Sequence, residues 1–101
     1  MVRRTSEVKD VETSATKIMS VTDEKIVKLK KIWAHNTATS DITFYFCDSG
    51  GTQKTPNIKV IAGQTLFVSE LELPEYAFES DIYALASASG IKLMIEVEES
   101  G

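Results

Sequence analysis

The sequence has few of the residues that bring reactivity, cross-links or bound metal to a small domain. It contains one cysteine, Cys47, and one histidine, His35. A single cysteine cannot form a disulfide within the chain, and a structural zinc site takes four Cys or His ligands. An internal disulfide is therefore excluded, a structural zinc site is disfavoured, and the low cysteine content indicates synthesis in the cytoplasm.

Long apolar runs and a basic excess are also missing. No apolar run approaches the ~20 residues of a membrane helix, and no apolar stretch follows the two N-terminal arginines as it would in a signal peptide. Fifteen acidic and 11 basic side chains give a net charge of −4. Binding to phosphate backbones needs a basic face, so the charge argues against nucleic acid as a partner. The missing apolar runs argue against a membrane.

The chain does contain alternating apolar residues. In residues 42–47 and 91–98 every second side chain is apolar, and the alternation places Ile42, Phe44 and Phe46 on one face and Leu93, Ile95 and Val97 on another. No segment has a helical stripe. The sequence therefore predicts an all-β fold, an antiparallel sandwich of about seven to nine short strands, jelly-roll-like or immunoglobulin-like, with these six residues in its core.

The 101 residues are expected to form one domain. We expect a flexible N-terminal arm over residues 1–12 and a single sandwich over 13–101. Strands are predicted at 58–62, 65–73, 81–87 and 91–98, with a loop over 48–57 and a hairpin turn over 88–90.

Residues 25–47 form the centre of the predicted sheet. Two strand-like runs are joined there by a polar connector, and we expect them to be neighbouring antiparallel strands. In the first run Leu29 and Trp33 share one parity, while Ile26 and Ile32 share the other. A β-bulge near Lys30 and Lys31 would bring more of these side chains to one face.

Several side chains could suggest chemistry. Cys47 and His35 could form a nucleophile pair, and Ser49-Gly50-Gly51-Thr52 could suggest a phosphate cradle. The first lacks an identified orienting group. The second lacks the lysine and the following helix of a P-loop. The acidic stretch described next fits no calcium loop. We therefore predict no enzyme activity, and no catalytic, cofactor or metal residues.

Charge is segregated along the chain. The basic stretch comprises Lys25, Lys28, Lys30 and Lys31, and the acidic stretch comprises Glu70, Glu72, Glu75, Glu79 and Asp81. Tyr76 and Phe78 lie within the acidic stretch and are predicted to be exposed anchors. One reading is two solvated faces. The other is a head-to-tail interface, in which the basic stretch of one subunit meets the acidic stretch of the next.

Residues 25–98 resemble a small β-sandwich module of tailed-phage and prophage virion proteins. The resemblance lies in the order of IWAHNT (32–37), DITFYFC (41–47), DSGGT (48–52), IKVIAGQTLFV (58–68) and IYALASASGIKLMIEVEE (82–99). It implies a capsid-decoration or head–tail accessory protein that forms a homo-oligomer, with a trimer favoured. A major capsid or tail protein would be its further partner, and the virion its final location.

A binding module is the competing hypothesis. Carbohydrate sites present exposed aromatic rings, and Trp33, Tyr45, Tyr76 and Tyr83 are the candidates. Burial of Trp33 within the sheet would argue against such a site.

Overall fold

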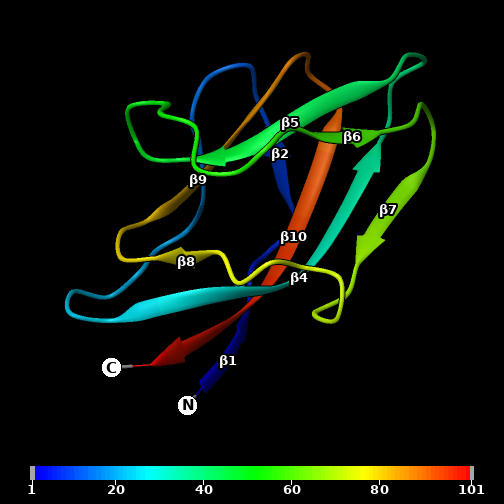
Figure 1. The fold of residues 1–101 in the computed structure, drawn as a ribbon. Coiled ribbons are helices and arrows are strands. Elements are labelled where there is room, and N and C mark those ends of the chain that lie inside the picture. The colour runs from blue at the N-terminus through cyan, green and yellow to red at the C-terminus, as the bar shows by residue number, and fades with distance from the viewer. Residues whose placement is uncertain (1, 101) are drawn as a thin grey trace.

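The computed structural model describes residues 2–100, and the regular structure in that range consists of strands in two antiparallel sheets (Figure 1). The predicted all-β antiparallel sandwich is confirmed. The strands are β1 (Val2–Thr5), β2 (Lys9–Val11), β3 (Thr16–Met19), β4 (Ile26–Asn36), β5 (Ile42–Cys47), β6 (Ile58–Val60), β7 (Thr65–Val68), β8 (Ala77–Phe78), β9 (Ile82–Ala86) and β10 (Ile91–Ser100).

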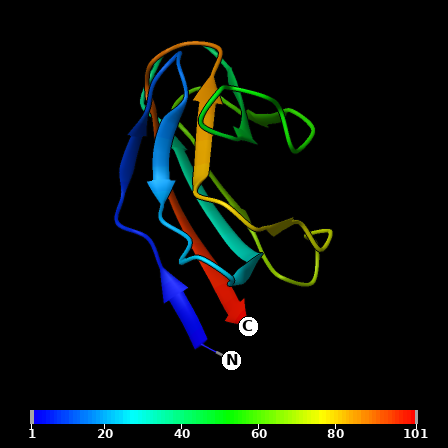
Figure 2. The same cartoon turned by 90° about the vertical axis from the view of Figure 1, so that its left-hand side faces the viewer.

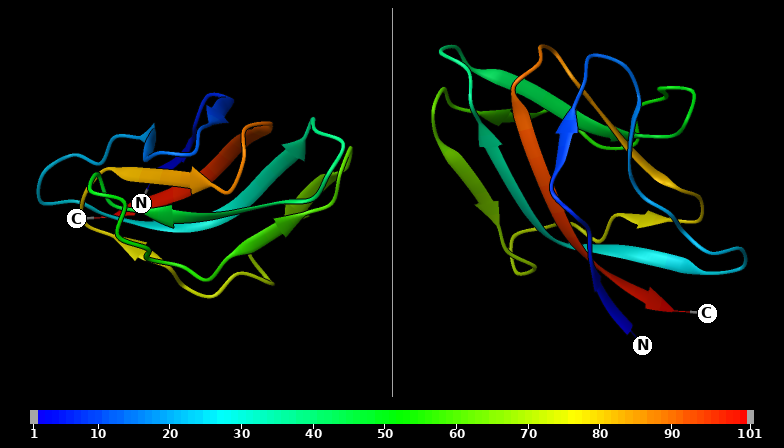
Figure 3. Two further views of the ribbon diagram at one scale, coloured as in Figure 1. Left: turned by 90° about the horizontal axis from the view of Figure 1, so that it is seen from above. Right: turned by 180° about the vertical axis from the view of Figure 1, so that it is seen from behind.

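The first sheet has the strand order β1-β10-β4-β7, with β2 also paired to β10 and β8 also paired to β4. The second sheet has the order β3-β9-β5-β6. The right-hand view of Figure 3 shows β7, β4, β10 and β2 side by side across the first sheet. Buried side chains from both sheets form one core between the two layers.

The pairing is nested around the loop between β5 and β6. β5 pairs with β6, β4 with β7, β3 with β9 and β2 with β10, all antiparallel. The chain is therefore a long ribbon of paired strands rolled into two layers, which is the jelly-roll arrangement. Contacts of β4 with β10 and of β5 with β9 complete the two sheets.

Two pairs of strands that were expected to be neighbours in one sheet lie in different sheets. β4 and β5 lie in different sheets, so the polar connector after β4 crosses between layers. β9 and β10 also lie in different sheets, so residues 87–90 are a crossover and not a hairpin turn. Gly90 holds this crossover with φ of 127°, and its carbonyl accepts the Thr37 N–H at 2.8 Å. A Cβ at position 90 would lie 3.2 Å from Ile42 Cδ1.

The N-terminal residues differ from the expected flexible arm. β1 pairs with the end of β10, from Val2 opposite Glu99 to Thr5 opposite Glu96. β2 pairs with the start of β10, and Val11 is buried in the core. The start of β1 and the end of β10 therefore lie together at one end of the first sheet (Figure 2). Residues 2–11 form strands of the same sandwich, so the structure shows no separate arm before residue 12.

β4 contains the predicted β-bulge. Lys31 lies opposite Glu96 and Leu29 lies opposite Val97, so Lys30 has no partner in the register. Val27 and Leu29 are buried before the bulge, and Ile32 and Ala34 are buried after it. The extra residue changes which parity faces the core, and the strand bends along its length (Figure 1).

The core contains all six residues that alternation assigned to it, from Ile42, Phe44 and Phe46 to Leu93, Ile95 and Val97. The strand predicted over 65–73 is shorter than expected. It ends at Val68, because the Ser69 carbonyl accepts the N–H groups of Glu72 and Leu73 and closes a turn. Leu71 in that turn is 94% exposed.

Asn36, at the end of β4, is a polar side chain with 0% exposure. Its Nδ2 donates to the carbonyls of Ser40 and Val60, each at 2.9 Å, and its Oδ1 accepts the Ala38 N–H at 2.8 Å. The side chain thereby ties the first sheet to β6 of the second sheet and to the crossover between β4 and β5. A buried amide is tolerated here because its hydrogen bonds are made.

Replacing Asn36 with Leu keeps the volume similar and removes these three hydrogen bonds. We expect the free energy of unfolding to fall by roughly 2–4 kcal/mol, since a buried polar group left unpaired costs about 1–3 kcal/mol. Urea unfolding monitored by circular dichroism measures the change. The control is Asn57→Leu, because Asn57 is exposed and accepts one bond from Gln53. Equal losses for the two variants would contradict the linking role of Asn36.

Candidate functional site

The basic and acidic stretches meet within one chain. β8 lies beside the first half of β4, with Lys28 opposite Ala77, and Lys28 Nζ lies 3.9 Å from a Glu75 carboxylate oxygen. Lys31 pairs with Glu96 at 3.5 Å, and Glu70 pairs with Arg3 at 3.2 Å. Lys28, Lys31 and Glu70 therefore have ion-pair partners within their own subunit. The head-to-tail interface between the basic and acidic stretches of two subunits stays a prediction.

The remaining charged residues of the two stretches lie in different surroundings. Lys25 precedes β4 in a turn, where its N–H donates to the Thr22 carbonyl, and Lys30 occupies the bulge. Glu72 accepts a hydrogen bond from Ser69 Oγ at 3.2 Å. Glu79 is exposed and lines a shallow surface hollow together with Asp81. These residues do not converge on one site.

Asp81 holds two segments together. It accepts the Val21 N–H at 2.8 Å, and its other oxygen lies 3.1 Å from Lys17 Nζ. The hydrogen bond from Val21, followed by the interaction with Lys17, lowers the pKa of the Asp81 carboxyl below its ordinary value. The carboxylate therefore stabilises the approach of β3 to the start of β9.

The two aromatic residues of the acidic stretch were predicted to be exposed anchors, and the structure corrects this. Phe78 is 7% exposed, and its ring centroid lies 6.3 Å from that of Phe46 in the core. Tyr76 is partly buried against the core, and its carbonyl accepts the Leu29 N–H at 3.0 Å. Phe78 is buried because β8 pairs with β4, which the local sequence did not reveal.

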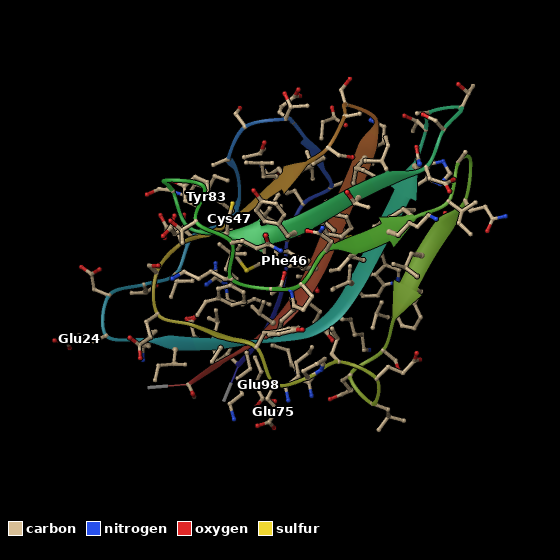
Figure 4. All side chains as sticks on the ribbon, turned by 45° about the horizontal axis from the view of Figure 1, so that its top comes forward. Glu24, Phe46, Cys47, Glu75, Tyr83 and Glu98 are labelled. Carbon is tan, nitrogen blue, oxygen red and sulfur yellow. The ribbon has the colours of Figure 1, made fainter. Side chains whose placement is uncertain are left out.

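Cys47 and His35 do not form a nucleophile pair. His35 lies on the outer face of the first sheet, where its Nδ1 is 2.8 Å from Thr65 Oγ1. Cys47 ends β5 in the second sheet, opposite Tyr83 (Figure 4), and is buried. Burial, followed by the charge of Asp48, raises the pKa of the Cys47 thiol.

The glycine-containing loop after β5 is organised by its own aspartate. Asp48 Oδ1 accepts the N–H groups of Gly50 and Thr52, at 2.9 and 3.0 Å. The hydrogen bonds from Thr52 and Gly50 lower the pKa of the Asp48 carboxyl. The amides that a phosphate cradle would need therefore already bind a carboxylate. Among residues 2–100, no group of three or more His, Cys, Asp or Glu side chains is placed to hold a metal ion.

An apolar row crosses the outer face of the first sheet and was not predicted from the sequence. Met94 of β10 lies opposite Trp33 of β4, and Trp33 lies opposite Phe67 of β7. The ring centroids of Trp33 and Phe67 are 5.4 Å apart and tilted by 35°. Phe67 is 48% exposed, and Val8, beside this row, is 60% exposed. We call Val8, Trp33, Phe67 and Met94 the outer-face patch.

Polar rows lie on both sides of the outer-face patch. On one side His35 bonds to Thr65, and Lys92 Nζ lies 2.8 Å from Asp10. A shallow hollow of about 220 Å³ lies between this row and the patch. On the other side Arg3 reaches Glu96 and Glu98, each at 3.3 Å. An apolar centre with a polar rim is the usual anatomy of a protein–protein contact.

The sequence contains a signal for this patch that could have been used. Phe67 has the parity opposite to Leu66 and Val68, and Met94 interrupts the polar face of an otherwise regular strand. Each is an apolar residue on a face expected to meet water. Only the cross-strand register, however, places them in one row with Trp33.

Comparison with known proteins found no match to a family model, a curated protein or a solved structure. Within residues 2–100, no helix of sufficient length and apolar character to cross a membrane is present.

Asp81→Asn should be less stable than the wild type at neutral pH, because the ion pair with Lys17 is lost. The folded-state pKa of Asp81 is lowered, so its contribution is present above the ordinary carboxyl pKa and is lost as pH falls through the folded value. The difference between the two proteins should therefore shrink below about pH 4. Urea midpoints at several pH values measure it. Glu79→Gln, the control, should show no such convergence, and a constant difference for Asp81→Asn would contradict the assignment.

Cys47 should resist thiol reagents in the folded protein, because the side chain is buried and its pKa is raised. Labelling followed by mass spectrometry should be slow in buffer and rapid in denaturant. Rapid labelling of the folded chain would mean that the loop over residues 48–57 opens readily, and would reopen the question of a reactive thiol.

Proposed function

We propose that this protein is a non-enzymatic assembly module that joins protein chains through the outer face of its first sheet. The observation that carries the proposal is the outer-face patch, an aromatic and methionine surface on regular strands between two polar rows. Trp, Phe and Met are enriched in the cores of protein–protein interfaces. The resemblance of residues 25–98 to virion modules gives the proposal its specific form, a homo-oligomeric capsid-decoration or head–tail accessory protein carried in the virion.

The neighbouring polar groups favour a protein partner over a small ligand. Ligand pockets typically enclose about 300–1,000 Å³ and contain a few polar groups that fix the orientation of the ligand. The hollow beside the patch has about 220 Å³, and the polar side chains along it, His35 and Lys92, are bonded to Thr65 and Asp10. A partner that covers the apolar row can leave these pairs intact.

The jelly-roll topology is compatible with the proposal. Jelly rolls occur in viral capsid proteins and in lectins, so the fold alone does not choose between assembly and sugar binding. The choice of assembly rests on the patch and its rim. The resemblance favours a trimer with a major capsid or tail protein as further partner. Lys28 and Glu70 are paired within their own subunit, so the outer-face patch supports assembly more directly than the segregated charges do.

Carbohydrate binding is the second candidate function, because Trp33 is only half-buried and lies beside an exposed ring. Stacking of a sugar on this pair is sterically open. The other proposed aromatics do not join it. Tyr45 and Tyr83 belong to strands of the second sheet, and Tyr76 packs against the core.

Trp33 is the only tryptophan, so its fluorescence reports on the outer-face patch directly. If copies associate through the patch, raising the protein concentration should shift the emission to shorter wavelength and reduce quenching by iodide. Phe67→Ser should weaken both effects. Ile26→Ser is the matched control, because Ile26 is 39% exposed, close to the 48% of Phe67, and lies outside the patch.

Sedimentation on the same samples gives the mass. A monomer with unchanged emission at every concentration would contradict self-association through this face. Emission that responds instead to added oligosaccharide at fixed protein concentration would favour the carbohydrate alternative.

A further inference from the structure

We propose that β7 is the strand through which two copies of this chain associate. The two β7 strands pair antiparallel about a two-fold axis and extend the first sheet from one copy into the other. This inference rests on the proposed homo-oligomer and names its partner as a second copy. It places the contact at the edge of the first sheet, beside the outer-face patch, and its two-fold symmetry gives a dimer in place of the trimer that the resemblance favours.

β7 is the one edge strand of three or more residues, within residues 2–100, that has no Lys or Arg. Proteins commonly protect sheet edges from pairing with other chains by placing charged residues on them. The other edge strands follow this rule with Arg3 and Arg4 (β1), Lys9 (β2), Lys17 (β3) and Lys59 (β6). The sequence of β7 is Thr-Leu-Phe-Val, which favours strand pairing and contains nothing to oppose it.

The backbone of β7 has its unused groups directed away from the sheet. The Asn36 N–H donates to the Gln64 carbonyl at 3.0 Å, and the register pairs Ala34 with Leu66. Hydrogen-bonded pairs alternate along an antiparallel ladder, so residues 64, 66 and 68 direct their backbone groups toward β4. Thr65 and Phe67 therefore direct their N–H and C=O groups toward the open edge.

A pairing centred on Leu66 uses all of these groups. It places Thr65 of one copy opposite Phe67 of the other, and the two-fold axis repeats the pair, which gives four backbone hydrogen bonds. Phe67 and its symmetry mate become diagonal neighbours, which are within reach of aromatic side chains at about 7–8 Å. The two Trp33–Phe67 pairs then form one aromatic row across the dimer.

Charge distribution favours a second copy as the occupant. No charged residue occurs over residues 60–69, although the chain as a whole carries −4. A two-fold axis through this segment brings no like charges together, whereas an axis through either acidic or basic stretch would. Three of the six large apolar side chains that are exposed in residues 2–100 also lie within or beside β7, namely Ile61, Phe67 and Leu71.

The register is tested by cross-linking. Leu66→Cys places two thiols opposite each other across the axis, at the short Cβ separation of a non-hydrogen-bonded pair. Thr65→Cys, on the same strand, lies opposite Phe67 of the partner and is beyond the ~7 Å between Cα atoms that a disulfide spans. Native Cys47 is buried, so the background from it is low. Under mild oxidation we expect Leu66→Cys to give a covalent dimer and Thr65→Cys to give little.

The interface is tested separately by sedimentation equilibrium. Phe67→Lys adds to β7 the charge that the other edge strands have. It should raise the dimer dissociation constant at least about tenfold, a change of about 1.4 kcal/mol. Ile26→Lys adds the same charge at an exposed apolar residue outside β7 and should leave the constant unchanged. Circular dichroism verifies that each variant is folded.

The outcomes separate this inference from the proposed function. An oligomer in which Leu66→Cys cross-links no better than Thr65→Cys overturns the β7 contact and leaves self-association through another surface. Equal weakening by Phe67→Lys and Ile26→Lys has the same consequence. A wild-type chain that stays monomeric at high micromolar concentration overturns both the β7 dimer and the homo-oligomer.

Discussion

The β-bulge at Lys30 is the constraint on which both the core and the candidate site depend. Before it, Val27 and Leu29 face the core. Without an extra residue the same parity would continue inward through Lys31 and Trp33, burying a charge and leaving Ile32 outside. The bulge shifts the pattern by one residue. Ile32 then enters the core, and Trp33 moves to the outer face, where it meets Phe67 and Met94.

Buried polar side chains also hold the sandwich together through hydrogen bonds. The phase that the bulge sets also brings Asn36 inward at the end of β4, where its amide bonds to both the crossover and β6. Ser6, after β1, and Thr55, in the loop between β5 and β6, are also buried and hydrogen-bonded. Their hydroxyl oxygens accept the N–H groups of Ile95 and Phe46, each at 3.0 Å. Asn36 thereby holds a crossover between the two layers, whereas Ser6 and Thr55 each hold a connection between strands of one sheet.

The charged side chains and the proposed contact between copies occupy different parts of the surface. Arg3 contacts three carboxylates, those of Glu70, Glu96 and Glu98, and the carboxyls of Asp48 and Asp81 bind backbone N–H groups. Charge is thus largely used to hold segments of the same subunit together. The part of the surface without charge, residues 60–69, coincides with the edge strand and with one end of the aromatic row. This division is why the proposed contact is apolar and backbone-mediated and not an ion-pair interface.

The sequence by itself determined the fold class, the central core residues and the bulge. Alternation in residues 42–47 and 91–98 requires a face that excludes water, and the broken parity between Leu29 and Ile32 requires an extra residue. Periodicity reports which face a side chain is on, but not which strand lies beside it. The separation of β4 from β5, the burial of Phe78 beside β4 and the row from Met94 to Phe67 were therefore decided only by the tertiary structure. The physical reason is that sheet pairing joins residues that are far apart in the chain. The sequence around one strand does not identify the strand that pairs with it.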